Sequence, residues 1–286
     1  MRPRGSFGFG LARSLDFHTS LASFTELCEL LSDAVEHVFY PHHALSYAEL
    51  SMGLERGELG LAWTPPIPAI DLQDRNAGSL LVAPVRKGST LYHAAMIVRA
   101  TPERPLKTLA DLKGRRAGWV DRDSAAGYLV PRLHLATNGF SPAGFFGQEL
   151  FLGSHIAVVD AVVSGRVDVG GTFCKVESHT GRVVNGAWTS PDGKNAKPVE
   201  ALATIGPIPN DMIVASNKLT PELRARIFRW FLDPPPRMLE ILAELVRADS
   251  CRAPTPSHYE PLRKMIAAAS QRGETPWRRN TVRPPP

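Results

Sequence analysis

The sequence predicts an α/β protein with two lobes, each a mainly parallel sheet that carries helices on both faces. Two observations lead to this prediction. Apolar runs of strand length alternate with helical patterns along the 286-residue chain. The pattern also begins again after a stiff connector that contains Pro102 and Pro105. We therefore expect a first lobe of residues 1–100 and 206–275, an inserted second lobe of residues 101–205, and a ligand cleft between them.

The elements of the first lobe are predicted from periodicity and capping patterns. The stretch 20–36 places apolar residues at i, i+3 and i+7, which only a helix brings to one face. Ser46 is expected to cap the next helix, with Glu49 completing a capping box and Gly57 ending the helix. Pro65 and Pro66 are expected to end the strand that begins at Leu59. The expected strands are 6–12, 38–44, 59–63, 80–85 and 92–99.

The second lobe repeats the alternation of strands and helices. A helix is expected from Ser124 to Thr137, with Gly139 as its stop, and the glycine-rich stretch 181–199 is expected to form a surface loop or hairpin. Thr220 is expected to cap a helix of the first lobe. The other expected elements are helices at 106–112, 154–164, 237–247 and 257–271, strands at 116–120, 150–152, 167–171, 201–205 and 212–215, and a disordered tail at 276–286.

The composition excludes several classes of protein. A hydrophobic content of 43% can bury a core that offsets chain entropy, yet no run reaches the roughly 20 apolar residues that cross a bilayer. The net charge of +5 comes largely from the two ends of the chain, so we expect no nucleic-acid partner. The three cysteines, Cys28, Cys174 and Cys251, are far apart, which favours neither disulfides nor a metal site.

The beginning of the chain lacks the pattern of an export signal. The apolar stretch 7–12 is interrupted by glycines and is shorter than the roughly 7–15 apolar residues of a secretory signal. As the sequence stands we expect a cytoplasmic monomer; the alternative is a periplasmic protein, if the true N-terminus is longer.

Three polar turns are each expected to connect a strand end with a helix start. They carry Ser46, Ser124 and Ser154, with Tyr47 and His155 as further donors. Taken singly, each serine is better explained as an ordinary N-cap, and His155 as an ordinary half-buried histidine. Helix starts have unpaired N–H groups, however, and three donor-rich starts together favour a site for a small tetrahedral oxyanion.

Several motifs resemble those of the phosphate-, phosphite- and phosphonate-binding proteins of ABC importers. The most specific are Ser-Ala-Ala-Gly-Tyr-Leu-Val-Pro at 124–131 and Gly-Ser-His at 153–155. The resemblance runs in order from about residue 6 to 230 and implies a type 2 periplasmic-binding-protein fold. The other matching segments are 47–50, 57–63, 109–114, 161–162, 165–170 and 209–211.

The resemblance also implies roles for individual residues. Tyr47, Tyr92, Ser124 and His155 match oxyanion ligands, and Asp211 matches an acidic position that holds the amino group of an aminophosphonate. The family's turn usually reads Ser-Thr-Ser-Gly, whereas this chain has Ala125 and Ala126 as its second and third residues. Two hydroxyl donors are thereby lost, each worth about 1.5–3 kcal/mol in a bond to a charged group. The backbone N–H groups of residues 124–127 remain and are expected to point into the cleft.

The sequence is therefore interpreted as that of a non-enzymatic protein that binds a small oxyanion such as phosphate, phosphite or a phosphonate. It would act as the substrate-binding component of an ABC transporter, with a permease as partner, or as a soluble sensor; no cofactor or metal is expected. The alternative is a cytoplasmic enzyme on the same fold that acts on a small carboxylate or phosphorylated metabolite. His155 and Asp211 would then be general base and acid, although no nucleophile–base pair or nucleotide loop supports this.

Overall fold

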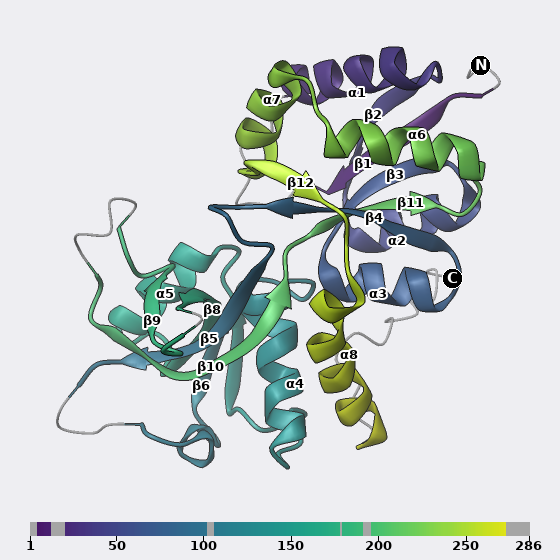
Figure 1. Ribbon diagram of the computed structural model, residues 1–286. Coiled ribbons are helices and arrows are strands. Elements are labelled where there is room, and N and C mark those ends of the chain that lie inside the picture. The colour runs from purple at the N-terminus through teal and green to yellow at the C-terminus, as the bar shows by residue number, and fades with distance from the viewer. Residues whose placement is uncertain (1–4, 13–20, 102–105, 178, 191–195, 273–286) are drawn as a thin grey trace. The chain divides into compact units, whose positions relative to one another are not determined.

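The computed structural model describes residues 5–12, 21–101, 106–177, 179–190 and 196–272 (Figure 1). The described chain forms two compact units. The first contains the residues up to Leu91 together with Pro209–Glu260, and the second contains Tyr92–Ile208 and the residues from Pro261 onward. The expected tail at 276–286 lies outside the described residues.

The first division of the chain falls at residues 91–92, whereas the sequence placed it near residue 100. Strand β5 (Leu91–Arg99) is the reason, because it pairs antiparallel with β8 (Val169–Val176) of the second unit. The apolar run that forms β5 is similar in composition to a first-unit strand. Only its pairing partner assigns it to the second unit.

The first unit is built on a six-stranded sheet with the order β12-β4-β11-β3-β1-β2. Strand β1 runs parallel to both β2 and β3, whereas β11 is antiparallel to β3 and β4, and β12 is antiparallel to β4. The sheet is therefore mixed, with a parallel part at β2-β1-β3. The strands are β1 Phe7–Ala12, β2 Phe39–Ala44, β3 Leu59–Thr64, β4 Gly78–Val85, β11 Met212–Ser216 and β12 Ser250–Arg252.

Helices cover both faces of this sheet (Figure 1). On one face α1, α6 and α7 form the main core with Phe9, Leu61 and Ile213 of the sheet; Cys28 of α1 is buried in this core, as expected. Helices α2 and α3 cover the other face. The helices of this unit are α1 Leu21–Val35, α2 Tyr47–Arg56, α3 Pro66–Asp74, α6 Pro221–Leu232 and α7 Pro236–Val246, and α8 (Pro256–Gln271) crosses the division between the units after Glu260. Within the described residues no helix could cross a membrane.

Strand β3 ends at Thr64, as expected from Pro65 and Pro66, but helix α3 begins directly after it, which the sequence analysis did not predict. Pro66 is the first helical residue and Pro68 lies in the first turn, where a helix has no use for the N–H that proline lacks. The two prolines therefore start a helix after β3. A proline in the first turn is compatible with a helix, whereas a proline in the interior interrupts it. The sequence pattern did not reveal that a helix begins at this point.

The cap of α2 is partly as expected. The Ser46 hydroxyl accepts the N–H of Glu49, and Gly57 ends the helix in the left-handed conformation. The Glu49 carboxylate does not complete the box on Ser46, because it accepts the N–H of Leu45 and contacts His42 instead. These hydrogen bonds keep the pKa of Glu49 below its usual range.

The second unit contains a sheet with the order β10-β5-β8-β6-β7, and β9 also pairs with β8. Strand β6 is parallel to β7 and β8, and β5 and β9 are antiparallel to β8, so this sheet too is mixed around a parallel part. The stretch 181–199, expected to be a loop or hairpin, contains β9, whose antiparallel pairing with β8 agrees with the hairpin. The further strands are β6 Arg116–Trp119, β7 Gln148–Phe151, β9 Val183–Gly186 and β10 Val199–Pro209.

Helix α5 (His155–Val163) packs Val159 and Val162 against Ala95 and Ile97 on one face of this sheet. A π-helix at Ala125–Leu129 continues into α4 (Val130–Thr137) and contacts β8. The short helix expected at 106–112 is a 3₁₀ turn at Leu109–Leu112, capped by Thr108 and Asp111.

The core of the first unit generates a stability prediction. Leu31 of α1 is 0% exposed, whereas Leu45 is 78% exposed. Leu31→Ala is expected to lower the free energy of unfolding by about 2–5 kcal/mol, because it removes buried contacts and leaves a cavity. Leu45→Ala, the matched control, is expected to change it by less than about 0.5 kcal/mol. Urea unfolding of both variants measures the difference, and equal effects would contradict the packing described.

Candidate functional site

Two of the expected site residues lie at one edge of the first sheet. Strands β1, β2 and β3 run in the same direction, so their carboxyl ends share an edge. Tyr47 begins α2 just after β2, and Asp211 comes directly before Met212, which pairs with Thr64 at the end of β3. Tyr47 and Asp211 are therefore at the carboxyl edge, where α/β sheets bind ligands.

The Asp211 carboxylate is already paired within the first unit. Its Oδ2 accepts a hydrogen bond from an Arg86 terminal nitrogen at 3.2 Å and from Trp63 Nε1 at 3.4 Å. The Nε of Arg86 donates to the carbonyl of Val246 at 2.9 Å. The group expected to hold a ligand amino group thus has a resident cation, which the sequence analysis did not foresee.

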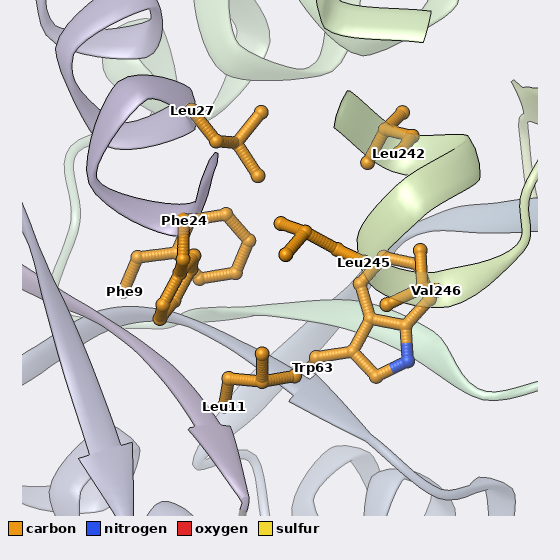
Figure 2. Close-up of a pocket in the computed structure, with 8 residues that line it drawn as sticks. All are labelled: Phe9, Leu11, Phe24, Leu27, Trp63, Leu242, Leu245 and Val246. Atoms are coloured by element: carbon orange, nitrogen blue, oxygen red, sulfur yellow. The ribbon is translucent and has the colours of Figure 1, made fainter. Parts of the chain in front are cut away.

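The ring of Trp63 packs among apolar side chains of the first unit and lines a small cavity with them. Figure 2 shows its ring beside the side chains of α1, α7 and β1 that line the pocket. The cavity of about 10 Å³ has room for no more than about one water molecule. It is a packing feature of the core, too small for a phosphonate. The lining residues are Phe9, Leu11, Phe24, Leu27, Trp63, Leu242, Leu245 and Val246.

The other expected site residues belong to the second unit and gather at the carboxyl edge of its sheet. Strands β6 and β7 are parallel neighbours; the turn after β6 carries Ser124, and the turn after β7 carries Ser154 and His155. The two turns are joined through Val120, whose N–H donates to the Gly127 carbonyl and whose carbonyl accepts the N–H of Gly153. The structure therefore places the serine turn and the Gly-Ser-His turn side by side.

The serine turn is a π-helix where an α-helix was expected at 124–137. Pro131 is the physical reason, because it has no N–H for the Gly127 carbonyl and its ring would clash with that carbonyl in an α-helix. The chain widens instead: Leu129 N–H donates to the Ser124 carbonyl and Val130 N–H to the Ala125 carbonyl, five residues back. The Gly127 carbonyl is released to accept the N–H of Val120.

This turn presents a specific set of donors. The Ser124 oxygen accepts the N–H of Gly127 at 3.1 Å, which leaves its own O–H to donate. The N–H of Ser124 is directed at the Asp121 carbonyl. The expectation that all N–H groups of 124–127 face a ligand is therefore wrong for Ser124 and Gly127. Within the described residues, those of Ala125 and Ala126 have no hydrogen-bond partner.

His155 is oriented by β8. Its Nδ1 lies 3.0 Å from the hydroxyl of Thr172, and its ring packs edge-on against Phe173 at 4.9 Å between ring centroids. Burial lowers the pKa of His155 to about 4, so the ring is neutral at pH 7. A Thr172 hydroxyl that donates to Nδ1 leaves the proton on Nε2, so the neutral ring is a donor at that atom.

Thr172 was not foreseen from the sequence, where it is one polar residue in an apolar strand. It is fully buried and pairs with Ala95 of β5. Side chains alternate along a strand, so Tyr92 of β5 lies on the opposite sheet face from Ala95 and Thr172. That is the face on which Gly171 approaches the Gly127 carbonyl of the serine turn. Tyr92 and the serine turn therefore share a face.

Arginines near the serine turn were also missed. The guanidinium of Arg122, in the turn itself, stacks over Phe151 at the end of β7 at 4.6 Å. Arg132 and Trp119 both donate to the Glu149 carboxylate, at 2.9 and 2.6 Å, beneath the turn. The charge of Glu149 is thus compensated by Arg132. Arg122 adds a cation to the turn that carries Ser124. Among the described residues no group of three or more His, Cys, Asp or Glu side chains could hold a metal ion.

The low pKa of His155 generates a pH prediction. The native ring stays neutral down to about pH 4, whereas an unfolded histidine takes up a proton near pH 6.5. The unfolded state gains a proton on this histidine below pH 6.5 and the folded state does not. The free energy of unfolding is therefore unaffected by His155 above pH 6.5 and falls as the pH drops from 6.5 toward 4. His155→Gln is expected to reduce the loss of unfolding free energy between pH 7 and pH 4 by about 1–3 kcal/mol. Urea unfolding at several pH values measures this loss.

His179→Gln is the control, because His179 is exposed. The half-buried His93 and His134 also have a lowered pKa, so the comparison is between each variant and the parent protein. An unchanged pH profile in His155→Gln would show that its ring is solvated.

Comparison with known proteins identifies the same architecture. In solved structures, XAC2383 from Xanthomonas citri, bound to chloride, is 19% identical with a TM-score of 0.75, over 94% of this chain and 99% of that one. The same protein bound to ATP is 18% identical, with a TM-score of 0.74, over 94% and 98%. These similarities show the two-lobed fold of the binding proteins.

Two proteins named for phosphonates are also similar. A binding-protein component of an ABC phosphonate transporter (PA3383) from Pseudomonas aeruginosa is 21% identical, with a TM-score of 0.68, over 94% of this chain and 87% of that one. PhnD1 from Prochlorococcus marinus, in complex with methylphosphonate, is 16% identical with a TM-score of 0.66, over 93% and 99%.

The family described as the periplasmic substrate-binding proteins of phosphonate ABC transporters matches residues 9–259. This span includes every expected site residue, in both units. The family consists of substrate-binding proteins rather than enzymes, in agreement with the sequence-based interpretation. The chain belongs to the phosphonate-binding family of ABC-transporter substrate-binding proteins.

Proposed function

We propose that this protein binds a small phosphonate-like oxyanion through Ser124, the N–H groups of Ala125 and Ala126, and His155, and delivers it to an ABC-transporter permease. The observation that carries the proposal is the junction at Val120, which holds two donor-rich helix starts next to each other. Tyr92 is assigned to the same ligand because it shares a sheet face with the serine turn. Tyr47 and Asp211 of the first unit are assigned to it from the family resemblance.

The chemistry of these donors suits an oxyanion. Each makes a hydrogen bond to an anionic oxygen without itself carrying a charge, and the helix start adds a partial positive charge. A neutral His155 donates from Nε2 and costs no buried charge in the absence of ligand. Three phosphonate oxygens match a hydroxyl, an imidazole and two backbone N–H groups better than the two oxygens of a carboxylate.

The two alanines adapt the turn to a particular ligand shape. Ala125 and Ala126 are buried, at 6% and 3% exposure, where the family usually has hydroxyl side chains. Their methyl groups form an apolar wall beside the backbone donors. A phosphonate with an apolar substituent therefore fits better than inorganic phosphate, whose fourth oxygen would face these methyl groups unpaired.

The importer and sensor roles differ in where the protein resides. The family is described as periplasmic, where delivery to a permease takes place, whereas a soluble sensor would act in the cytoplasm. Cell fractionation distinguishes the two: a periplasmic protein supports delivery to a permease, and a cytoplasmic one supports the soluble sensor.

Ligand binding is tested by calorimetry and thermal melting with methylphosphonate, phosphite, phosphate, sulfate, acetate and ATP. Methylphosphonate is expected to bind, and at 100 times its dissociation constant to stabilise the protein by about 2.7 kcal/mol. Ser124→Ala and His155→Ala are each expected to weaken binding about 10- to 150-fold, because each removes a bond to a charged oxygen worth about 1.5–3 kcal/mol.

Thr220→Ala is the matched control. Thr220 caps α6 through the N–H of Leu223, as Ser124 caps the π-helix through the N–H of Gly127, both at hydroxyl–nitrogen distances close to 3 Å. The control is expected to lose stability but no ligand affinity. The proposal fails if no oxyanion binds at millimolar concentration, or if binding survives both site substitutions.

A further inference from the structure

We propose that Phe173 makes this protein select phosphonates whose organic group is aromatic, such as benzylphosphonate, over phosphonates with a small alkyl group. This inference rests on the proposed function and specifies its ligand class. Its basis lies entirely within the second unit. Phe173 is an exposed phenyl ring on β8 that packs against His155, one of the proposed oxyanion donors.

The ring of Phe173 is an exposed apolar surface on a rigid strand. Thr172 and Cys174, its neighbours along β8, point to the opposite face and are 0% exposed, whereas Phe173 is 37% exposed. Its backbone is held on both sides, because Phe173 pairs with Ala94 of β5 and its carbonyl accepts the N–H of Ala187 at 3.3 Å. A large apolar side chain is therefore presented to solvent from a fixed position.

The register of the sheet places Phe173 at the level of the serine turn. Strand β8 is parallel to β6, with Gly170 opposite Gly118. Strand β6 ends at Trp119, whereas β8 continues past Phe173. Phe173 is as far along the chain from Gly170 as Asp121 is from Gly118, so it is level with the residues that follow β6. Phe173 thus projects beyond the end of β6, beside the serine turn.

The direction of the ring follows from the alternation of side chains along β8. Gly171 and Phe173 are two residues apart and therefore face the same side of the sheet. A Cβ atom at Gly171 would lie 2.8 Å from the Gly127 carbonyl oxygen and 2.8 Å from the Trp119 ring, so this is the side that the serine turn covers. The Phe173 ring also meets the His155 ring edge-on, at 4.9 Å between centroids. Phe173 is therefore next to both sets of proposed donors.

An aromatic substituent on the phosphonate suits this surface. The proposed function places the organic group beside the methyl groups of Ala125 and Ala126, and the Phe173 ring extends that apolar wall. The single methylene of benzylphosphonate lets its ring turn toward Phe173 while the oxyanion keeps its hydrogen bonds. Two aromatic rings in an offset or edge-on arrangement gain more than the burial of apolar area alone, and a methyl group covers little of this surface.

The test compares benzylphosphonate with methylphosphonate by isothermal calorimetry, because the two ligands share a headgroup and differ only in the ring. The parent protein is expected to bind benzylphosphonate at least about fivefold more tightly. Phe173→Ala is expected to remove that preference, and Phe173→Tyr, which keeps the ring, is expected to retain it. The affinity for methylphosphonate reports whether His155 still donates in each variant.

Phe151→Ala is the matched control. Phe151 is a phenylalanine of the same unit with a similar exposure of 39%, but its ring already contacts the Arg122 guanidinium at 4.6 Å and the Tyr128 ring at 5.2 Å. Its removal is expected to leave the ratio of the two affinities unchanged. The inference is overturned if the parent protein does not prefer benzylphosphonate, or if a folded Phe173→Ala variant keeps the parent ratio. If Phe173→Ala does not fold, Phe173→Leu takes its place, with the preference again expected to fall.

These outcomes separate this inference from the proposed function. A parent protein that binds neither phosphonate would contradict the proposed function itself. Binding of methylphosphonate without a preference for benzylphosphonate would contradict the role of Phe173 alone.

Discussion

The two hydrogen bonds of the Val120 backbone are the interaction on which the proposed site of the second unit depends. Its N–H holds the Gly127 carbonyl of the serine turn, and its carbonyl holds the N–H of Gly153 ahead of α5. Both bonds are available because β6 and β7 are parallel and end at the same level, and because Pro131 releases the Gly127 carbonyl from the helix. One residue at a strand end therefore aligns two helix starts.

One half-buried carboxylate in each unit, Glu149 and Asp211, has resident hydrogen-bond partners. Glu149 accepts bonds from Trp119 and Arg132 beneath the serine turn, and Asp211 accepts bonds from Trp63 and Arg86 in the first unit. An indole N–H and a guanidinium satisfy each carboxylate, which would otherwise be costly to bury. The anion binding that we propose for the second unit can therefore rely on neutral donors and helix starts.

His155 shows how burial changes the chemistry of a donor. A histidine in water is partly protonated near pH 6.5 and would bind an anion more strongly as the pH falls. Packed against Phe173 and bound to Thr172, it remains neutral to about pH 4 and acts as a fixed hydrogen-bond donor. Such a donor keeps the same charge throughout the physiological pH range.

The sequence by itself determined the local structure: the amphipathic face of α1, the caps at Ser46 and Thr220, the stop at Gly57, and the succession of strand end and donor-rich helix start at Ser124 and His155. Each of these depends on residues within a few positions of one another. Only the tertiary structure decided that β5 pairs with β8, that Thr172 orients His155, and that Arg86 neutralises Asp211. Those partners are far apart in the chain, up to 125 residues for Arg86 and Asp211. No local pattern encodes such a pair, because an ion pair requires only that folding bring two charges together.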